Sequence, residues 1–248
     1  MLSEKVVLTL SGGMDSSVLL FMAAKKFKEI HTISFDYGQR HKRELNCISL
    51  QINDAIAKHG VKVTNKIIDV KYIKDISPVS SLTNNNIDNP NIKEMAGDAQ
   101  PISYVPFRNN MFVSIAASYA ESLGCNEIWY GSAEADSLAG YWDSSPEWLD
   151  SMNNILSLNR KTKIKLVAPL INKSKMQIIK DGVELKVNFA NTWTCYSDRA
   201  DGLADANTPS SSLRLRGFLD AGYIDPIEYV QQDKILVLYK KFNCFSIT

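Results

Sequence analysis

The stretch "VVLTLSGGMDSSVLLFMAA", residues 6–24, runs from a strand through a turn into a helix. Residues 6–10 form a short apolar run rich in β-branched side chains, which is typical of a buried strand. From Ser16 onward, apolar residues recur at helical spacing. Between the two, Gly12 and Gly13 allow backbone conformations closed to other residues and let a ligand approach the main chain. We expect Asp15 or Ser16 to cap the helix.

A glycine-rich loop before a helix presents backbone N–H groups at the positive end of the helix dipole, so it is predicted to bind phosphate. The loop lacks the lysine of G-x-x-x-x-G-K-[ST] and does not match G-x-G-x-x-G. The order "SGGMDSS" resembles the pyrophosphate loop of ATP-pyrophosphatases, which split ATP into AMP and pyrophosphate. An ordinary strand–turn–helix connection is the alternative, and the presence of Ser11, Asp15, Ser16 and Ser17 together favours an ATP site.

Composition predicts an ordinary globular enzyme. The chain has 248 residues, 45% of them hydrophobic, and a formal net charge of +1, so no basic excess indicates nucleic-acid binding. No apolar run reaches membrane-spanning length, and the polar start "MLSEK" is unlike a signal peptide. The four cysteines are scattered without a C-x-x-C pair, which indicates reduced thiols and a cytoplasmic location.

Strand and helix patterns alternate along the chain. Strands are predicted at 29–37, 61–70 and 127–130, and helices at 41–59, after "PFRN", and at 172–185. This alternation predicts an α/β fold, with a doubly wound, mostly parallel sheet covered by helices on both faces. Ligands of such sheets bind at the carboxyl ends of the strands. We expect an α/β domain over residues 1–189 and a small helical lobe over residues 190–248.

Three polar clusters follow predicted strands. The first, "DYGQRHKRE", contains Gln39 and Arg40. The second, "YVPFRNNMF", places Arg108 beside a helix start, where its planar guanidinium can pair with an anion, and offers Asn109 as a helix cap. The third, "GSAEADSLAGYWDSSPEW", offers carboxylates that could hold magnesium or accept hydrogen bonds from a heterocycle. Taken alone, the first cluster is more typical of a solvated loop before a helix. A surface arginine is an equal alternative for Arg108, and a turn-rich loop whose acids cap neighbouring helices is the alternative for the third cluster.

Together these segments resemble the 7-cyano-7-deazaguanine synthase family of the queuosine pathway. "LSGGMDSSVLL", "SFDYGQRHKRE", "SSLT", "YVPFRNNMF", "GSAEADSLAGYWDSSPEW", "APLINKSK" and "TWTCY" occur in the family's order. The resemblance implies an adenine-nucleotide α-hydrolase-like fold and a homodimer. It also implies that ATP, with Mg²⁺, adenylates 7-carboxy-7-deazaguanine and that ammonia then forms an amide. A second adenylation would dehydrate the amide to the nitrile.

The resemblance also implies roles for individual residues. The predicted ATP-binding residues are Leu10, Ser11, Gly12, Gly13, Met14, Asp15, Ser16, Ser17, Phe35 and Gly131. The predicted catalytic residues are Asp15, Ser16, Arg108 and Lys175. The predicted substrate-binding residues are Gln39, Arg40, Tyr104, Phe107, Arg108, Asn109, Asp136, Tyr141 and Asp143.

The chain departs from the family at its zinc site. Relatives bind one structural zinc through four cysteines near the C-terminus, and this chain keeps only Cys195. The other three positions fall near Asp205, Thr208 and Ser211. A structural zinc site needs four good ligands, mostly thiolate or imidazole, so we expect no zinc. We expect apolar packing to hold the lobe together instead, through Trp193, Leu203, Leu213, Leu215 and Phe218.

A second departure leaves the product open. Ser144 and Ser145 replace a cysteine and an arginine of the family pattern. One alternative is therefore a specialised homologue of the bacterial defence type, which stops at the amide or joins the deazaguanine to a protein amine. A non-catalytic nucleotide-binding subunit is another alternative. A tRNA-thiolating ATP-pyrophosphatase is disfavoured, because the sequence shows neither a cysteine cluster nor a basic face for RNA.

Overall fold

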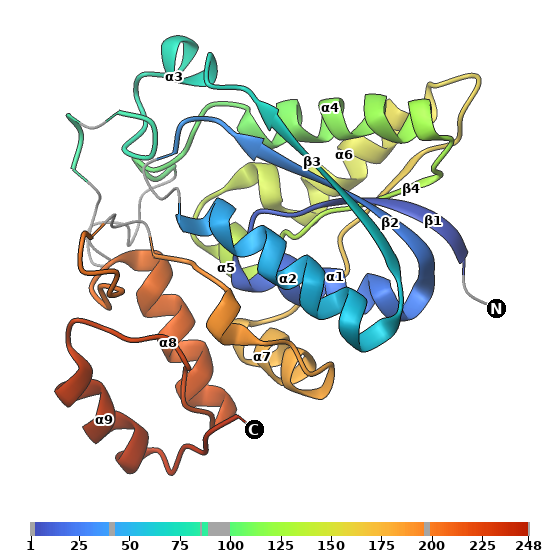
Figure 1. Ribbon diagram of the computed structural model, residues 1–248. Coiled ribbons are helices and arrows are strands. Elements are labelled where there is room, and N and C mark those ends of the chain that lie inside the picture. The colour runs from blue at the N-terminus through green and yellow to red at the C-terminus, as the bar shows by residue number, and fades with distance from the viewer. Residues whose placement is uncertain (1–2, 40–42, 85, 89–99, 196–198, 248) are drawn as a thin grey trace.

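A five-stranded parallel sheet forms the centre of the computed structural model, which describes residues 3–39, 43–84, 86–88, 100–195 and 199–247. Its strand order is β3-β2-β1-β4-β5, and every neighbouring pair is parallel (Figure 1). The strands are β1 (Ser3–Thr9), β2 (Phe27–Asp36), β3 (Lys62–Asp69), β4 (Glu127–Trp129) and β5 (Lys165–Val167). The chain reverses its direction across the sheet at β1, whose neighbours are β2 and β4. This confirms the predicted doubly wound sheet.

Helices cover both faces of the sheet (Figure 1). One face carries α1 (Met14–Lys26), α2 (Arg43–His59) and α7 (Lys175–Glu184), and the other carries α4 (Arg108–Leu123) and α6 (Pro146–Ser157). Each face has its own apolar cluster, because the strands are buried on both sides. Two short helices, α3 (Ile73–Ile76) and α5 (Glu134–Leu138), lie in the connections that follow β3 and β4.

Three helix starts differ from the expected ones. The N-cap of α1 is Gly13, with no side-chain cap, so Asp15 and Ser16 lie in the first turn and the capping prediction was wrong. The N-cap of α4 is Phe107, not Asn109, and its backbone has the left-handed φ of 53°. Helix α7 begins later than predicted because Ser174 caps it, accepting a hydrogen bond from the backbone N–H of Gln177 at 3.4 Å.

The C-terminal part contains α8 (Pro209–Ala221) and α9 (Gln232–Lys241) around a third apolar cluster. Trp193 and Leu215 belong to this cluster, as predicted, whereas Leu203 and Leu213 are only partly buried. Phe218 instead joins the core of the sheet domain, where its ring meets Phe189 edge to face at 5.3 Å. Because α8 contributes to both cores, the division at residue 189 stays a prediction.

A buried ion pair, which the sequence analysis did not foresee, lies at the centre of this lobe. Arg214 and Asp225 are both fully buried in their side chains and form two hydrogen bonds, of 2.7 and 2.8 Å. Tyr229 donates to the same carboxylate at 2.7 Å, and Arg214 donates to Thr192 Oγ1 at 2.7 Å. A desolvated ion pair is tolerated only when its polar atoms are satisfied in this way. Polar contacts therefore accompany the apolar packing that we expected to hold the lobe.

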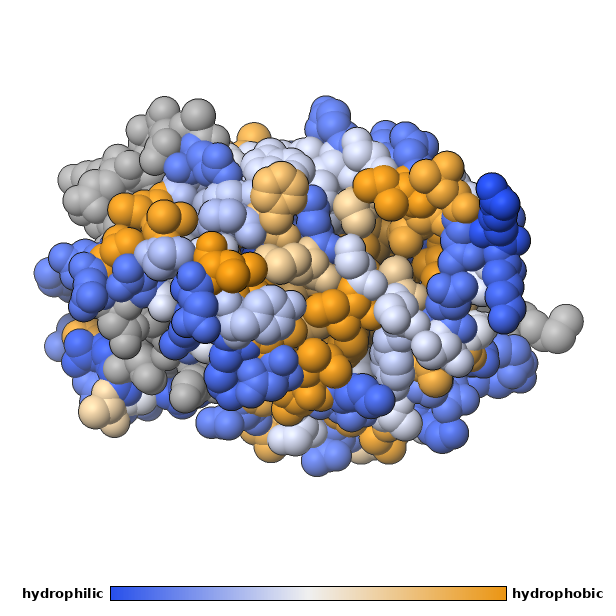
Figure 2. Space-filling view, turned by 90° about the horizontal axis from the view of Figure 1, so that it is seen from above, coloured by the Kyte–Doolittle hydropathy of each residue, from blue (hydrophilic) through white to orange (hydrophobic). Residues whose placement is uncertain are grey.

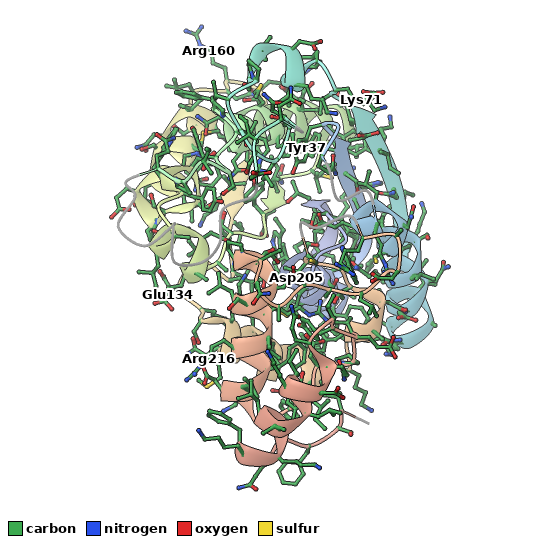
Figure 3. All side chains as sticks on the ribbon, turned by 90° about the vertical axis from the view of Figure 1, so that its left-hand side faces the viewer. Tyr37, Lys71, Glu134, Arg160, Asp205 and Arg216 are labelled. Carbon is green, nitrogen blue, oxygen red and sulfur yellow. The ribbon has the colours of Figure 1, made fainter. Side chains whose placement is uncertain are left out.

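The residues at the four zinc positions of the family lie together. Cys195 Sγ accepts a hydrogen bond from the backbone N–H of Asp205 at 3.3 Å and lies 3.7 Å from Thr208 Oγ1. Thr208 in turn donates to Ser211 Oγ at 2.8 Å. Asp205 lies at the end of α8 nearest the sheet, and Arg216 farther along the helix (Figure 3). The positions where relatives have thiolates thus form a small hydrogen-bonded cluster around one thiol.

We predict that the purified protein contains no stoichiometric zinc. One thiol, a carboxylate and two hydroxyls are poor zinc ligands, and the hydroxyls already bond to one another. Elemental analysis should give far less than one zinc per chain, and the melting temperature should be unchanged in EDTA. About one zinc per chain, with a melting temperature lowered by EDTA, would contradict this prediction, because structural zinc supplies on the order of 10 kcal/mol of folding free energy.

Among the residues that the structure describes, no helix has the length and apolar character needed to span a membrane. The face formed by α3, α4 and α6 carries both hydrophobic and hydrophilic side chains (Figure 2). Helix α6 shows the pattern in detail, since Trp148 and Met152 are buried whereas Ile155 is exposed. Such a mixture is ordinary for the outer face of a helix on a water-exposed domain.

Candidate functional site

The loop between β1 and α1 is held in one conformation by its serines and glycines. Ser11 Oγ accepts the backbone N–H of Gly13 at 3.1 Å and lies 3.1 Å from Ser16 Oγ. Ser17 Oγ donates to the Gly13 carbonyl at 2.8 Å. Gly12 has a φ of 95°, and a Cβ there would lie 1.9 Å from the backbone oxygen of Glu44. Glycine is therefore required at this position both by conformation and by space.

A pocket of about 270 Å³ opens at the carboxyl ends of the strands, beside this loop. Many of the predicted site residues line it: Leu10, Ser11, Gly13, Met14, Asp15, Ser16, Phe35, Gln39, Arg108, Asn109, Gly131, Asp136, Tyr141 and Lys175. Gly12, Ser17, Tyr104, Phe107 and Asp143 do not line it, and Arg40 lies outside the described residues. The sheet topology thus gathers residues from distant parts of the chain into one site, and their individual roles stay predictions.

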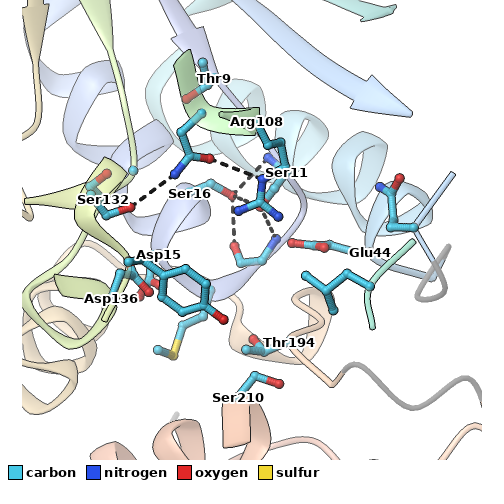
Figure 4. Close-up of a pocket in the computed structure, with 18 of the residues that line it drawn as sticks. Thr9, Ser11, Asp15, Ser16, Glu44, Arg108, Ser132, Asp136, Thr194 and Ser210 are labelled. Carbon is cyan, nitrogen blue, oxygen red and sulfur yellow. Dashed lines mark hydrogen bonds between the residues drawn. The ribbon is translucent and has the colours of Figure 1, made fainter. Parts of the chain in front are cut away.

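Two carboxylates and one ammonium form a charged cluster on the pocket wall. Lys175 Nζ donates to Asp15 Oδ2 at 2.5 Å, and Asp136 Oδ2 accepts the backbone N–H of Ala133 at 3.0 Å. Burial alone would lower the pKa of Lys175, but Asp15 and Asp136 outweigh it and raise that pKa. Lys175 therefore carries a positive charge at neutral pH. Asp15 and Asp136 lie close together in Figure 4.

The two carboxylates of this cluster have features typical of a ligand-binding site. Asp15 Oδ1 is buried and has no hydrogen-bond partner among the described residues. Burial raises the pKa of Asp136, and the nearby charge of Lys175 only partly offsets this. A buried carboxylate oxygen without a partner is unusual in a folded protein and indicates that a bound group completes its contacts.

Arg108 enters the pocket from the first turn of α4. Its guanidinium lies over the ring of Tyr37, with 5.4 Å between Cζ and the ring centroid, and Nη1 donates to Tyr37 Oη at 3.4 Å. The ring contact and this hydrogen bond limit the orientation of the guanidinium before a ligand arrives. In Figure 4 the Arg108 side chain lies next to Ser11 and Ser16 of the loop.

We predict that Arg108→Lys lowers kcat/KM for the organic substrate at least about tenfold. A lysine keeps the charge but loses the planar fork, the contact of the guanidinium with the Tyr37 ring and the bidentate geometry. The measurement is initial-rate kinetics of pyrophosphate release with varied substrate. Arg160→Lys, in the connection between α6 and β5, is the matched control and should behave as the wild type. Unchanged kcat/KM in Arg108→Lys would make Arg108 an ordinary surface arginine.

The segment after α5 supports the substrate end of the pocket. Asn109 Nδ2 donates to the Asp143 carbonyl at 3.0 Å and to Ser144 Oγ at 3.2 Å. Asp143 is almost fully buried, and its Oδ1 has no partner among the described residues. Burial raises the pKa of Asp143, although the charge of Arg108 opposes the shift.

Ser145 caps α6 by accepting the backbone N–H of Trp148 at 3.1 Å. Both serines that depart from the family pattern thus have local structural partners.

Tyr104 and Phe107 lie outside the pocket lining. The hydroxyl of Tyr104 accepts hydrogen bonds from the backbone N–H of Phe107 at 3.0 Å and from Trp142 Nε1 at 2.9 Å. The Phe107 ring meets Trp142 edge to face at 5.3 Å and is 59% exposed. This aromatic group ties the start of α4 to the segment that contains Asp143, and the predicted substrate-binding roles of Tyr104 and Phe107 stay predictions.

Several residues that line the pocket were not predicted as binding or catalytic residues from the sequence: Glu44, Ser132, Thr194, Thr208, Ser210 and Leu213. Glu44, Ser132 and Thr194 stand inside quoted motifs, "DYGQRHKRE", "GSAEAD" and "TWTCY", which was the available signal. Ser210 and Leu213 belong to α8, and nothing in their local sequence shows that α8 faces the loop. In Figure 4, Thr194 and Ser210 lie across the pocket from Arg108.

The fold and the pocket define a doubly wound α/β protein with a pocket at the topological switch point of its sheet, beside a glycine- and serine-rich loop. A family model described as "Queuosine biosynthesis protein QueC" matches residues 5–222, and the chain belongs to this family.

Relatives with assigned names agree with this membership. The 7-cyano-7-deazaguanine synthase of Thermoplasma volcanium is 40% identical over 230 residues, which cover 91% of each chain. The enzyme of the same name from Clostridium kluyveri is 39% identical over 234 residues, covering 91% of this chain and 98% of the other. Among solved structures, NMN synthetase from Francisella tularensis is 14% identical with a TM-score of 0.48, covering 97% of this chain and 84% of that one, a likeness too low to carry an argument.

Proposed function

We propose that this protein is an ATP-dependent ligase that adenylates the carboxylate of 7-carboxy-7-deazaguanine and passes the acyl group to ammonia. The observation that carries the proposal is one pocket that holds the predicted pyrophosphate loop, the Asp15–Lys175 pair and Arg108 together. Family membership supplies the substrate class. The substrate carboxylate would attack the α-phosphorus of ATP, with pyrophosphate as the leaving group.

The protein groups in the pocket suit this chemistry, because adenylation mainly requires two anions to be positioned and developing charge to be stabilised. The N–H groups of the loop and Lys175 would stabilise the leaving pyrophosphate. Arg108 would pair with the substrate carboxylate or a phosphate. Ammonia would then attack the acyl adenylate, releasing AMP and forming the amide. No nucleophilic side chain is needed.

Magnesium fits the same cluster. Asp15 Oδ1 is a buried carboxylate oxygen without a partner among the described residues, and Asp136 lies next to it. Mg²⁺ usually binds one or two carboxylates together with substrate phosphates. When bound there, the ion would neutralise charge on the pyrophosphate. Asp15 would then hold both Lys175 and the ion toward the same leaving group.

Two further outcomes follow from the same intermediate. A second adenylation, at the amide oxygen, would let that oxygen leave with AMP as two protons are lost from nitrogen, which gives the nitrile, the product that the names of the relatives indicate for them. Replacement of a cysteine and an arginine by Ser144 and Ser145 next to Asp143 favours a second candidate, in which the enzyme stops at the amide or transfers the acyl group to a protein amine.

Mass spectrometry of the products, combined with a pyrophosphate assay, tests the proposal. The protein is incubated with 7-carboxy-7-deazaguanine, ATP, Mg²⁺ and ammonia, with and without a candidate protein acceptor. We expect AMP, pyrophosphate and the amide or nitrile of the deazaguanine. A mass increase on the acceptor would identify the second candidate. Absence of pyrophosphate release under all of these conditions would favour a non-catalytic nucleotide-binding subunit.

A further inference from the structure

The back of the pyrophosphate loop, on the side away from the pocket, is fixed by two hydrogen bonds to one carbonyl. The Gly12 carbonyl accepts the side-chain Nε2 of Gln51 at 2.8 Å and the backbone N–H of Trp193 at 3.2 Å. Gln51 lies on α2 and Trp193 on the segment that leads to the C-terminal lobe. Two elements far apart in the sequence therefore meet at one peptide group of the loop.

The orientation of this peptide group matters for ligand binding. The Gly12 carbonyl and the Gly13 N–H belong to the same planar trans peptide, so they point in opposite directions. Fixing the carbonyl toward Gln51 fixes the N–H toward the pocket side, where it donates to Ser11 Oγ at 3.1 Å. Gly12 has a φ of 95°, and a glycine has little intrinsic resistance to rotation of the adjoining peptides. The neighbours of this peptide must therefore set its orientation.

The side-chain amide of Gln51 acts as a hydrogen-bond donor. Its side chain is 2% exposed, and Nε2 also donates to the Asn191 carbonyl at 3.0 Å. Both partners are carbonyl oxygens, so the amide group can take only one orientation. Its Oε1 is left buried without a partner among the described residues, which is unfavourable for stability. An apolar side chain of similar size would avoid that penalty, so the two donated bonds are the distinctive contribution of glutamine here.

The same contacts connect the loop to the buried ion pair of the lobe. Asn191 ends the short 3-10 helix Phe189–Asn191, and Arg214 donates to the Phe189 carbonyl at 3.1 Å and to Thr192 Oγ1 at 2.7 Å. The segment between Phe189 and Trp193 is thus held by Gln51 from α2 and by Arg214 from α8. Its Trp193 N–H and the Gln51 amide then converge on Gly12.

We propose that Gln51 is a positioning residue for the pyrophosphate loop. Its amide fixes the Gly12–Gly13 peptide and joins the loop to the segment that Arg214 anchors. This inference rests on the proposed binding of ATP at the loop. It assigns a function to a residue that contacts neither the pocket nor the reacting groups.

The test uses Gln51→Met, which keeps the length and apolar volume of the side chain but donates nothing, and Gln51→Leu as a second variant. The melting temperature of the full chain is measured with and without MgATP, because a bound ligand raises it by an amount that grows with the logarithm of its concentration divided by Kd. Asn153→Leu is the matched control: Asn153 joins α6 to β5 through bonds of 3.0 and 2.9 Å to Leu166, away from the pocket.

We expect Gln51→Met to keep a melting temperature near that of the wild type without ligand, but to lose much of the shift produced by MgATP. Its kcat/KM for ATP should fall about tenfold, the size of one net hydrogen bond. Asn153→Leu should show the opposite pattern: a lower melting temperature with an undiminished MgATP shift.

If both Gln51 variants showed the same MgATP shift and the same kcat/KM as the wild type, the inference would be overturned and the proposed function would stand. Gln51 variants with a lower melting temperature but an undiminished MgATP shift would also overturn the inference. A wild-type protein that shows neither a MgATP shift nor pyrophosphate release would overturn the proposed function and this inference with it.

Discussion

Pyrophosphate release is expected to fall at least about a hundredfold when Asp15 is replaced by alanine. Asp15 lies in the first turn of α1 and holds Lys175 Nζ at 2.5 Å, while its other oxygen is buried and without a partner among the described residues. The substitution therefore releases the cation that faces the leaving group and removes the best candidate ligand for Mg²⁺. Ser16→Ala should have a similar but smaller effect, since Ser16 Oγ lies between Ser11 and the Gly13 carbonyl.

The Lys173–Asp181 ion pair provides a matched control for this experiment. It joins the same kinds of group near the same helix, α7, but lines no part of the pocket. Asp181→Ala should leave pyrophosphate release close to that of the wild type, and circular dichroism should show all three variants folded. If both Asp15→Ala and Ser16→Ala released pyrophosphate at nearly the wild-type rate, the loop would not be part of the catalytic site.

Local patterns predicted much of the fold. The strand–loop–helix unit was recognisable because burial on both faces makes a strand continuously apolar, and because glycines are needed where the chain turns beneath a ligand. The helix starts were less predictable. Asn109 has the composition of a cap, yet it lies inside α4, where its side chain bonds to the Asp143 carbonyl of a distant segment. A tertiary contact therefore sets the role of Asn109, and the local sequence does not indicate that contact.

Short elements were also missed. Strand β5 has only three residues, Lys165–Val167, and it begins with an exposed lysine, so it shows no clear apolar run. Helix α6, which was also not predicted, begins at Pro146 and is capped by Ser145, which had been interpreted only as a departure from the family pattern. Its cap role becomes visible only with the Trp148 N–H in place. The loop residues of the site were therefore easier to predict than the helices that support them.

One wall of the pocket could be predicted from the sequence, whereas the opposite wall could not. The pyrophosphate loop, Arg108 and Asp136 lie in motifs that follow strands, and parallel topology brings such segments to one edge. The opposite wall comes from α8, through Ser210 and Leu213. Its position depends on how the lobe packs on α7 and on the buried pairing of Arg214 with Asp225, which are eleven residues apart. Arginine side chains are mostly exposed in folded proteins, so nothing in the sequence indicated that Arg214 is buried.

That pairing leads to the second large effect, on stability. Arg214→Met is expected to lower the free energy of unfolding by about 3–5 kcal/mol, because it leaves the Asp225 carboxylate buried without its counter-charge. The guanidinium also satisfies the Phe189 carbonyl and Thr192 Oγ1, so their hydrogen bonds are lost as well. Urea unfolding measures the change: the midpoint should fall while the slope with denaturant stays the same.

The same helix offers the control. Arg216 pairs with Asp220 at 2.8 Å, but its side chain is 64% exposed, and such pairs contribute no more than about 1 kcal/mol. Arg216→Met should therefore leave the midpoint nearly unchanged. The double variant Arg214→Met with Asp225→Leu should be more stable than Arg214→Met alone, since it removes the unpaired charge together with its partner. If Arg214→Met and Arg216→Met shifted the midpoint equally, burial of the Arg214–Asp225 pair would not be what stabilises the lobe.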